Sequence, residues 1–130
     1  MKKFILVLVL FFYIPYGYSL TLPNKLAKDF SGLKIAELTV EDNALLIKLD
    51  QNKVSVEALK NTIKSSFCIS VNQNVADWKK LNIKQVVMTN KFGLQGYIFK
   101  GGIEECLDIW KLTSDEVNNK YMNDDYIEML

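Results

Sequence analysis

The chain contains no histidine and no arginine among its 130 residues. Without imidazole, Ser-His-Asp and Cys-His catalysis are excluded, and so is nearly every zinc site built on histidine ligands. Without guanidinium, bidentate recognition of phosphate or carboxylate is excluded as well, and every basic side chain is a lysine. These absences favour a protein without a cofactor, a metal site or a conventional catalytic centre.

The first nineteen residues have the three parts of a secretory signal peptide. Two lysines come first, residues 4–14 are apolar and uncharged, Pro15 follows, and small residues precede Leu20. The pattern predicts cleavage between Ser19 and Leu20. A membrane-spanning helix needs about 20 apolar residues, so this run is too short for a stable anchor. We therefore expect an exported protein, periplasmic in the first instance, with full secretion as the alternative.

The mature chain, residues 20–130, is long enough for a single domain with a modest hydrophobic core. Two of the 16 lysines fall in the signal peptide, and the remaining 14 nearly balance the 15 acidic residues. A balanced domain as a whole has no electrostatic attraction to nucleic acid or anionic lipid. The acidic residues gather after Thr113, where Lys120 is the one cation. That end of the chain could therefore meet a basic partner.

Cys68 and Cys106 are an even pair in a chain predicted to be exported. In an oxidising compartment the expectation is one disulfide. The bridge would close a loop of about 39 residues and stabilise the fold by about 4 kcal/mol on the chain-entropy account. A reactive thiol is the alternative, but the sequence has no Cys-x-x-Cys spacing and no histidine to activate a thiolate.

Local patterns predict two β-hairpins. Leu45, Ile47 and Leu49 alternate with polar residues, as they do in a strand with one buried face. The turn at residues 41–43 contains residues that tolerate a left-handed backbone. The predicted strands are 33–40 and 44–49, joined by a turn at 41–43, and 83–89 and 94–100, joined by a turn at 90–93, with 68–71 as a possible short strand.

Capping signals predict the helices. Ser55 is placed to cap the first, and Thr113 with Glu116 forms a capping box before the last. The predicted helices are 56–66, 75–81, 103–112 and 114–129. The order is therefore two strands, a helix, a possible short strand and helix, two strands and two helices. It predicts an α+β fold, with a small antiparallel sheet built from two hairpins and helices packed on one side.

A carboxylate pair is the remaining route to catalysis. Glu37 with Glu41, or Glu104 with Asp108, could in principle act as the two acids of a glycosidase. Nothing in the sequence selects one pair over the others, and acidic residues that face water are the usual case. An envelope hydrolase is therefore the alternative to a non-catalytic function.

The leading hypothesis is a non-catalytic protein that acts by protein–protein binding, for example an inhibitor or an immunity-type protein against another exported or envelope protein. Aromatic residues and methionine are enriched at the centres of interfaces, and here they lie beside the acidic end. Core packing is their alternative role. A structural accessory domain, with a homodimer through an exposed strand edge, is a further possibility. The candidate partner-binding residues are Trp110, Tyr121, Met122, Asp124, Asp125 and Tyr126.

Overall fold

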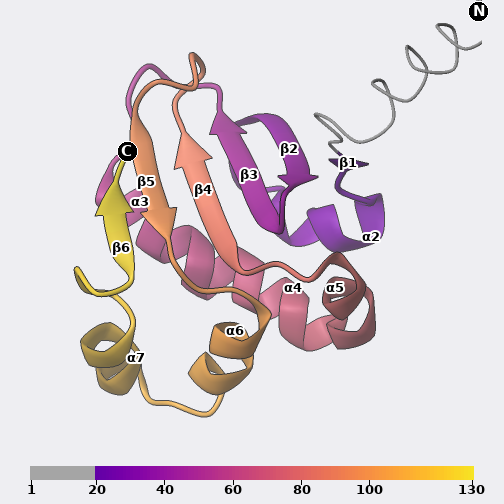
Figure 1. Ribbon diagram of the computed structural model, residues 1–130, viewed down its shortest axis with the longest axis vertical. Helices are drawn as coiled ribbons and strands as arrows, with labels where there is room; N and C mark the ends of the chain where they lie inside the picture. Colours follow the sequence, from indigo (N-terminus) through magenta and orange to yellow (C-terminus); the bar gives the residue numbers. More distant parts are fainter. Residues whose placement is uncertain (1–19) are drawn as a thin grey trace, which may run out of the picture.

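The computed structural model describes residues 20–130, and the predicted signal peptide, residues 1–19, lies outside the described residues. The described chain forms a six-stranded sheet whose strands lie side by side in chain order, from β1 to β6 (Figure 1). The strands are β1 (Leu20–Thr21), β2 (Ile35–Glu41), β3 (Ala44–Leu49), β4 (Gln85–Thr89), β5 (Gly96–Phe99) and β6 (Ile127–Met129).

The long helix that follows β3 lies behind the strands in Figure 1, and two short helices lie below the sheet. In the described residues, no helix has the length and apolar character needed to cross a membrane. The helical elements are α2 (Asn24–Ala27), η1 (Lys28–Phe30), α3 (Val56–Thr62), η2 (Ile63–Phe67), α4 (Cys68–Gln73), α5 (Val75–Leu81), α6 (Ile103–Ile109) and α7 (Ser114–Lys120).

Two predicted helix caps are confirmed. The Ser55 hydroxyl accepts a hydrogen bond from the Ala58 amide at 3.1 Å, at the start of α3. Before α7, the Thr113 hydroxyl accepts from the Glu116 amide at 3.3 Å, and the Glu116 carboxylate accepts from the Thr113 amide at 2.9 Å. Each cap satisfies amides that lack a partner in the first helical turn.

The α+β fold is confirmed, but the sheet is mixed and not purely antiparallel. β3 and β4 run parallel, with Leu45 opposite Val86, and the other neighbouring strands are antiparallel. A parallel pair needs a long crossover, which residues 50–84 supply with α3 to α5. Side-chain alternation is the same in both kinds of pair, so the sequence pattern could not distinguish them.

The possible short strand at residues 68–71 is wrong, because these residues are helical. α3, η2 and α4 follow one another without a break, and η2 is a π-helical turn. Cys68 and Val71 are buried and lie three residues apart, a spacing that places them on one face of α4. A short apolar run fits a buried strand or a buried helix equally well, and here the helix continues through it.

The C-terminal helix is shorter than predicted. α7 ends at Lys120, and the chain then turns at Asn123, whose side-chain oxygen accepts a hydrogen bond from the Asp125 amide at 2.9 Å. Residues 127–129 form β6 against β5. Pairing with a distant strand satisfies the backbone of this segment, and helix periodicity carries no information about such a pairing.

The hydrophobic core lies between the sheet and the helices. Leu45, Ile47 and Leu49 alternate along β3 on the helix side and are at most 2% exposed. Behind them, the rings of Phe67 and Trp78 meet edge to face, with their centroids 5.2 Å apart. In the part of the chain that the structure describes, the helices lie on this side of the sheet, and none covers the other face of β3 (Figure 1).

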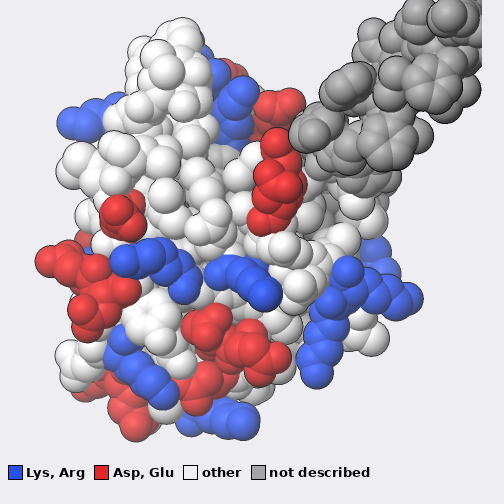
Figure 2. Space-filling model, in the orientation of Figure 1, with Lys and Arg blue, Asp and Glu red and all other residues white. Residues whose placement is uncertain are grey.

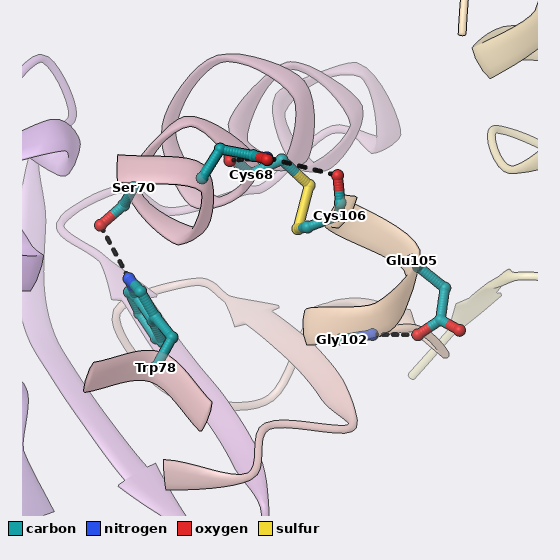
Figure 3. The surroundings of a disulfide bond; sticks show 7 residues. Cys68, Ser70, Trp78, Gly102, Glu105 and Cys106 are labelled. Carbon is teal, nitrogen blue, oxygen red and sulfur yellow. Dashed lines mark hydrogen bonds between the residues drawn. A yellow bond between two sulfur atoms is a disulfide. The ribbon is translucent and has the colours of Figure 1, made fainter. Parts of the chain in front are cut away.

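The predicted disulfide is confirmed. Cys68 at the start of α4 is bonded to Cys106 in α6, and both side chains are buried (Figure 3). The same region holds the buried Trp78 indole, which donates a hydrogen bond to the Ser70 hydroxyl at 2.9 Å. The bridge therefore links the helix that crosses behind the sheet to the helix that follows β5.

Candidate functional site

The uncovered face of the sheet is the first candidate site. We call it the open face, and Figure 1 views the molecule from this side. At its centre lie Leu46 of β3, Val87 of β4 and Ile98 of β5, all partly exposed. Parallel strands are usually covered on both faces. The centre of the open face, at the parallel pair of β3 and β4, is therefore an apolar strip that a partner can cover.

A groove of about 310 Å³ runs along the open face. We call it the open-face groove. Leu46 and Val87 form its floor, and Lys48 and Glu37 form an ion pair in its wall with a nitrogen–oxygen distance of 3.2 Å. Glu41 also lines the groove, and it has no ion-pair partner among residues 20–130. The lining residues are Glu37, Thr39, Glu41, Leu46, Ile47, Lys48, Val87, Thr89 and Gly93.

The loop between β4 and β5 is the second candidate site. We call residues 91–94 the apex loop, because they project at one end of the longest dimension of the molecule (Figure 1). Phe92 is 62% exposed and Leu94 is 83% exposed. The Lys91 ammonium lies 5.2 Å from the centre of the Phe92 ring. Two large apolar side chains therefore stand in solvent beside a cation.

The side-chain amides of Asn90 and Gln95 hold the apex loop in place. Asn90 is 5% exposed, and its side-chain oxygen accepts hydrogen bonds from the Leu94 and Gln95 amides at 3.0 and 3.3 Å. Its side-chain nitrogen donates to the Asn52 carbonyl at 3.0 Å. The Gln95 side chain accepts from the Val54 amide and donates to the Val54 carbonyl, both at 2.7 Å. The loop conformation is thus tied to the neighbouring loop.

No match to this chain is found among known protein families, curated proteins or solved structures. Its candidate sites therefore have to be assessed by geometry and chemistry alone. Among residues 20–130, no group of three or more histidine, cysteine or acidic side chains is arranged to hold a metal ion.

The predicted partner-binding residues do not form one exposed stripe. Trp110 is 62% exposed at the end of α6, and Asp124 and Asp125 are exposed. Tyr121 and Met122 are 4% and 6% exposed and belong to the core. Tyr126 is partly buried, and its ring lies 4.9 Å from that of Tyr121 and 5.9 Å from that of Phe99. The aromatic side chains pack inward because α7 ends before them.

Sequence reasoning did not single out Phe92 and Leu94. Their signal was present, since turns usually carry polar residues and this one carries two large apolar ones next to Gly93. The open-face groove had no such signal. It depends on which strands become neighbours and on which face the helices cover.

The carboxylate pairs offer poor geometry for hydrolysis. Glu37 and Glu41 both lie on the open face, but Glu37 is paired with Lys48, with a nitrogen–oxygen distance of 3.2 Å. In the other pair, Asp108 is bound by Lys120 at 2.7 Å and by the Tyr121 hydroxyl. Neither arrangement favours a pair of free acids facing one substrate.

Asp108, Lys120 and Tyr121 form a cluster that ties α6 to the end of α7. Hydrogen bonds from Lys120 and then Tyr121 hold the pKa of Asp108 below its usual value. Burial, followed by the hydrogen bond to Asp108, raises the pKa of Tyr121 from 10.0 to about 12. The phenol is therefore kept neutral in the folded state, as suits a structural hydrogen-bond donor.

The raised pKa of Tyr121 predicts a loss of stability in alkali. A phenol whose pKa is higher when folded stabilises the protein fully below pH 10, and this contribution is lost as the pH rises from 10 towards about 12. Tyr121→Phe lacks the contribution, so we expect urea midpoints of the two proteins to differ at pH 9 and to converge by pH 12. A constant difference across this range would contradict the assignment. Absorbance at 295 nm should show one late-titrating phenol that the variant lacks.

The sheet edges give little support for a homodimer. β1 has 2 residues and β6 has 3, so each edge offers few free backbone groups. A symmetric antiparallel pairing of β6 with a second copy is centred on Glu128 and sets two glutamates opposite each other. Short edge strands that carry charged side chains are one way in which natural sheets avoid such pairing.

Proposed function

We propose that this is a small exported, non-catalytic protein that acts by binding another protein through the open-face groove. An inhibitor or immunity-type protein against an exported or envelope protein is the specific form of the proposal. The observation that carries it is the apolar strip of Leu46, Val87 and Ile98, which lies on the uncovered side of the sheet, at the central parallel pair. Burying apolar surface is the main driving force of protein association.

The chemistry of the groove indicates what its partner presents. The Glu37 and Lys48 charges compensate each other, and so do Glu128 and Lys100, whose charged atoms lie 3.7 Å apart on the same face. Glu41 is left as the uncompensated charge among these five open-face residues. Figure 2 shows the uncharged centre of this face with acidic side chains on both sides. The occupant we propose is a protein segment with apolar side chains for the floor and a basic side chain for Glu41.

Capture from an envelope extract, with residues 20–130 as bait, tests the proposal. Leu46→Lys places a cation on the groove floor, where it repels a basic segment, and its aliphatic stem preserves contact with the sheet. Trp110→Lys makes a similar change at an exposed position on α6. We expect the same protein to be captured by the unmodified bait and by Trp110→Lys, and to be lost with Leu46→Lys.

The captured protein must then bind as a purified component in a one-to-one complex, with at least about tenfold weaker affinity for Leu46→Lys. If Trp110→Lys weakens binding and Leu46→Lys does not, the groove is excluded and the C-terminal residues become the binding surface. If repeated trials yield no specific protein, protein binding itself is contradicted. Self-association of the bait, measured by light scattering, would identify a second copy as the occupant instead.

A further inference from the structure

The apex loop lies outside the proposed groove function except at Gly93, and its two apolar side chains need an explanation of their own. Phe92 and Leu94 are among the most exposed large apolar residues of the described chain, at 62% and 83%. Figure 2 shows this end as an uncharged lobe with a basic side chain on its left and both basic and acidic side chains on its right. A flat surface could touch these side chains without meeting α6 and α7, which lie at the other end of the molecule (Figure 1).

Basic side chains surround the apex. The Lys91 amide donates to the Gln51 carbonyl at 3.0 Å, and the Asp50 amide donates to the Lys34 carbonyl at 2.8 Å, so these loops adjoin. Within these loops, residues 33–34, 50–54 and 91–94, the exposed charged side chains are those of Lys34, Lys53 and Lys91 and the carboxylate of Asp50, and the adjoining Glu37 is paired with Lys48. α6 and α7, at the other end of the molecule (Figure 1), together carry five carboxylates and one lysine, so these two helices are acidic. An anionic surface would orient the protein with its apex inward.

The surface area that the apex loop can bury favours a membrane over a protein pocket as its binding partner. A stable protein interface buries about 800 Å² on each partner, and two side chains on a narrow loop supply a small part of that. A bilayer interface needs less, because a few apolar side chains enter the headgroup region while nearby lysines attract anionic lipids. Phenylalanine, leucine and lysine are the residue types that such contacts use.

We infer that the apex loop is a peripheral membrane contact, in which Phe92 and Leu94 enter the interface of an anionic bilayer and Lys53 and Lys91 face its headgroups. The hydrogen bonds of Asn90 and Gln95 support this role, because they fix the loop before it meets the lipid and no ordering is required on binding. The contact uses side chains that do not line the open-face groove, and because Gly93 belongs to both surfaces it would place the groove beside the membrane.

Sedimentation with vesicles tests the inference. Residues 20–130 are mixed with vesicles of phosphatidylglycerol and phosphatidylcholine in equal amounts, or of phosphatidylcholine alone, in 0.1 M salt. We expect partitioning into the anionic vesicles and at least about tenfold weaker partitioning for Phe92→Ser with Leu94→Ser. Lys53→Gln and Lys91→Gln should each weaken it about fivefold. Trp110→Ser is the matched control, since Trp110 and Phe92 are equally exposed at 62%.

A fluorescent reporter adds a readout of insertion. Phe92→Trp in a Trp110→Phe background should shift its emission to shorter wavelength when anionic vesicles are added, because the indole leaves water. The inference is overturned if the unmodified protein does not partition, if Trp110→Ser weakens partitioning as much as the apex variant, or if the reporter does not shift. It is also overturned if the apex variant keeps its vesicle binding and loses a captured protein, which would make the loop a protein contact.

Discussion

Replacing both Cys68 and Cys106 by alanine should lower the free energy of unfolding by about 4 kcal/mol. The two cysteines are 38 positions apart in the chain, and the closed loop removes conformational freedom from the denatured chain. Because small domains are stable by only about 5–15 kcal/mol, the bridge accounts for much of the total. Urea unfolding at pH 7, followed by tryptophan fluorescence, measures the difference.

The disulfide prediction has an internal control. Reductant added in denaturant should bring the unmodified protein to the midpoint of the double variant and leave the double variant unchanged. A loss below about 1 kcal/mol would mean that the denatured chain is compact enough without the bridge. Besides the bridge, the Asn72 amide donates to the Cys68 and Cys106 carbonyls at 2.8 and 3.4 Å, so the variant retains a hydrogen bond between α4 and α6.

Features determined within a few residues were predictable from the sequence. The Ser55 cap and the Thr113 capping box depend on side chains three residues away, and both are present. The turn after β2 is similar, because Asp42 and Asn43 adopt the left-handed backbone that their residue types tolerate, at φ 50° and 63°. Cysteine count and predicted export were enough to predict the bridge.

Features that depend on distant segments were not predictable in the same way. β1 and β6 have too few residues to show alternation, and they are strands because β2 and β5 are there to pair with them. The parallel pairing of β3 with β4 also depends on segments that are distant in the sequence. The candidate sites follow from it, since the open-face groove exists only when residues from β2, β3 and β4 adjoin on the side without helices.

Tyr121 shows why the sequence pattern did not decide which candidate residues are exposed. Helical spacing placed it on an apolar stripe with Met122 and Tyr126, a pattern equally consistent with a core and with a binding surface. The length of α7 decides between them, and α7 stops at Lys120 because β6 pairs with β5. Tyr121 is buried and Tyr126 is partly buried, so Trp110 is the exposed aromatic side chain among the predicted partner-binding residues.

The second large effect is expected at Gly102, where the chain passes from β5 into α6. A Cβ atom here would lie 1.9 Å from the Ile83 carbonyl oxygen and 2.6 Å from the Ile83 carbonyl carbon. Both are backbone atoms, so no side-chain rotation can relieve the clash. The Ile103 amide donates to the same Ile83 oxygen at 3.2 Å, and the Glu105 carboxylate accepts from the Gly102 amide at 2.6 Å (Figure 3). Movement at Gly102 therefore strains the start of α6.

Gly102→Ala should destabilise the protein by about 3 kcal/mol, the upper part of the range for overpacking a tight site. Gly32→Ala is the matched control, because a Cβ there meets nothing within 4 Å. It should change the stability by less than about 1 kcal/mol, in the stabilising direction. Urea midpoints of the two variants measure the contrast. Equal midpoints would contradict the prediction and show that the β5–α6 connection can move to accommodate a Cβ atom.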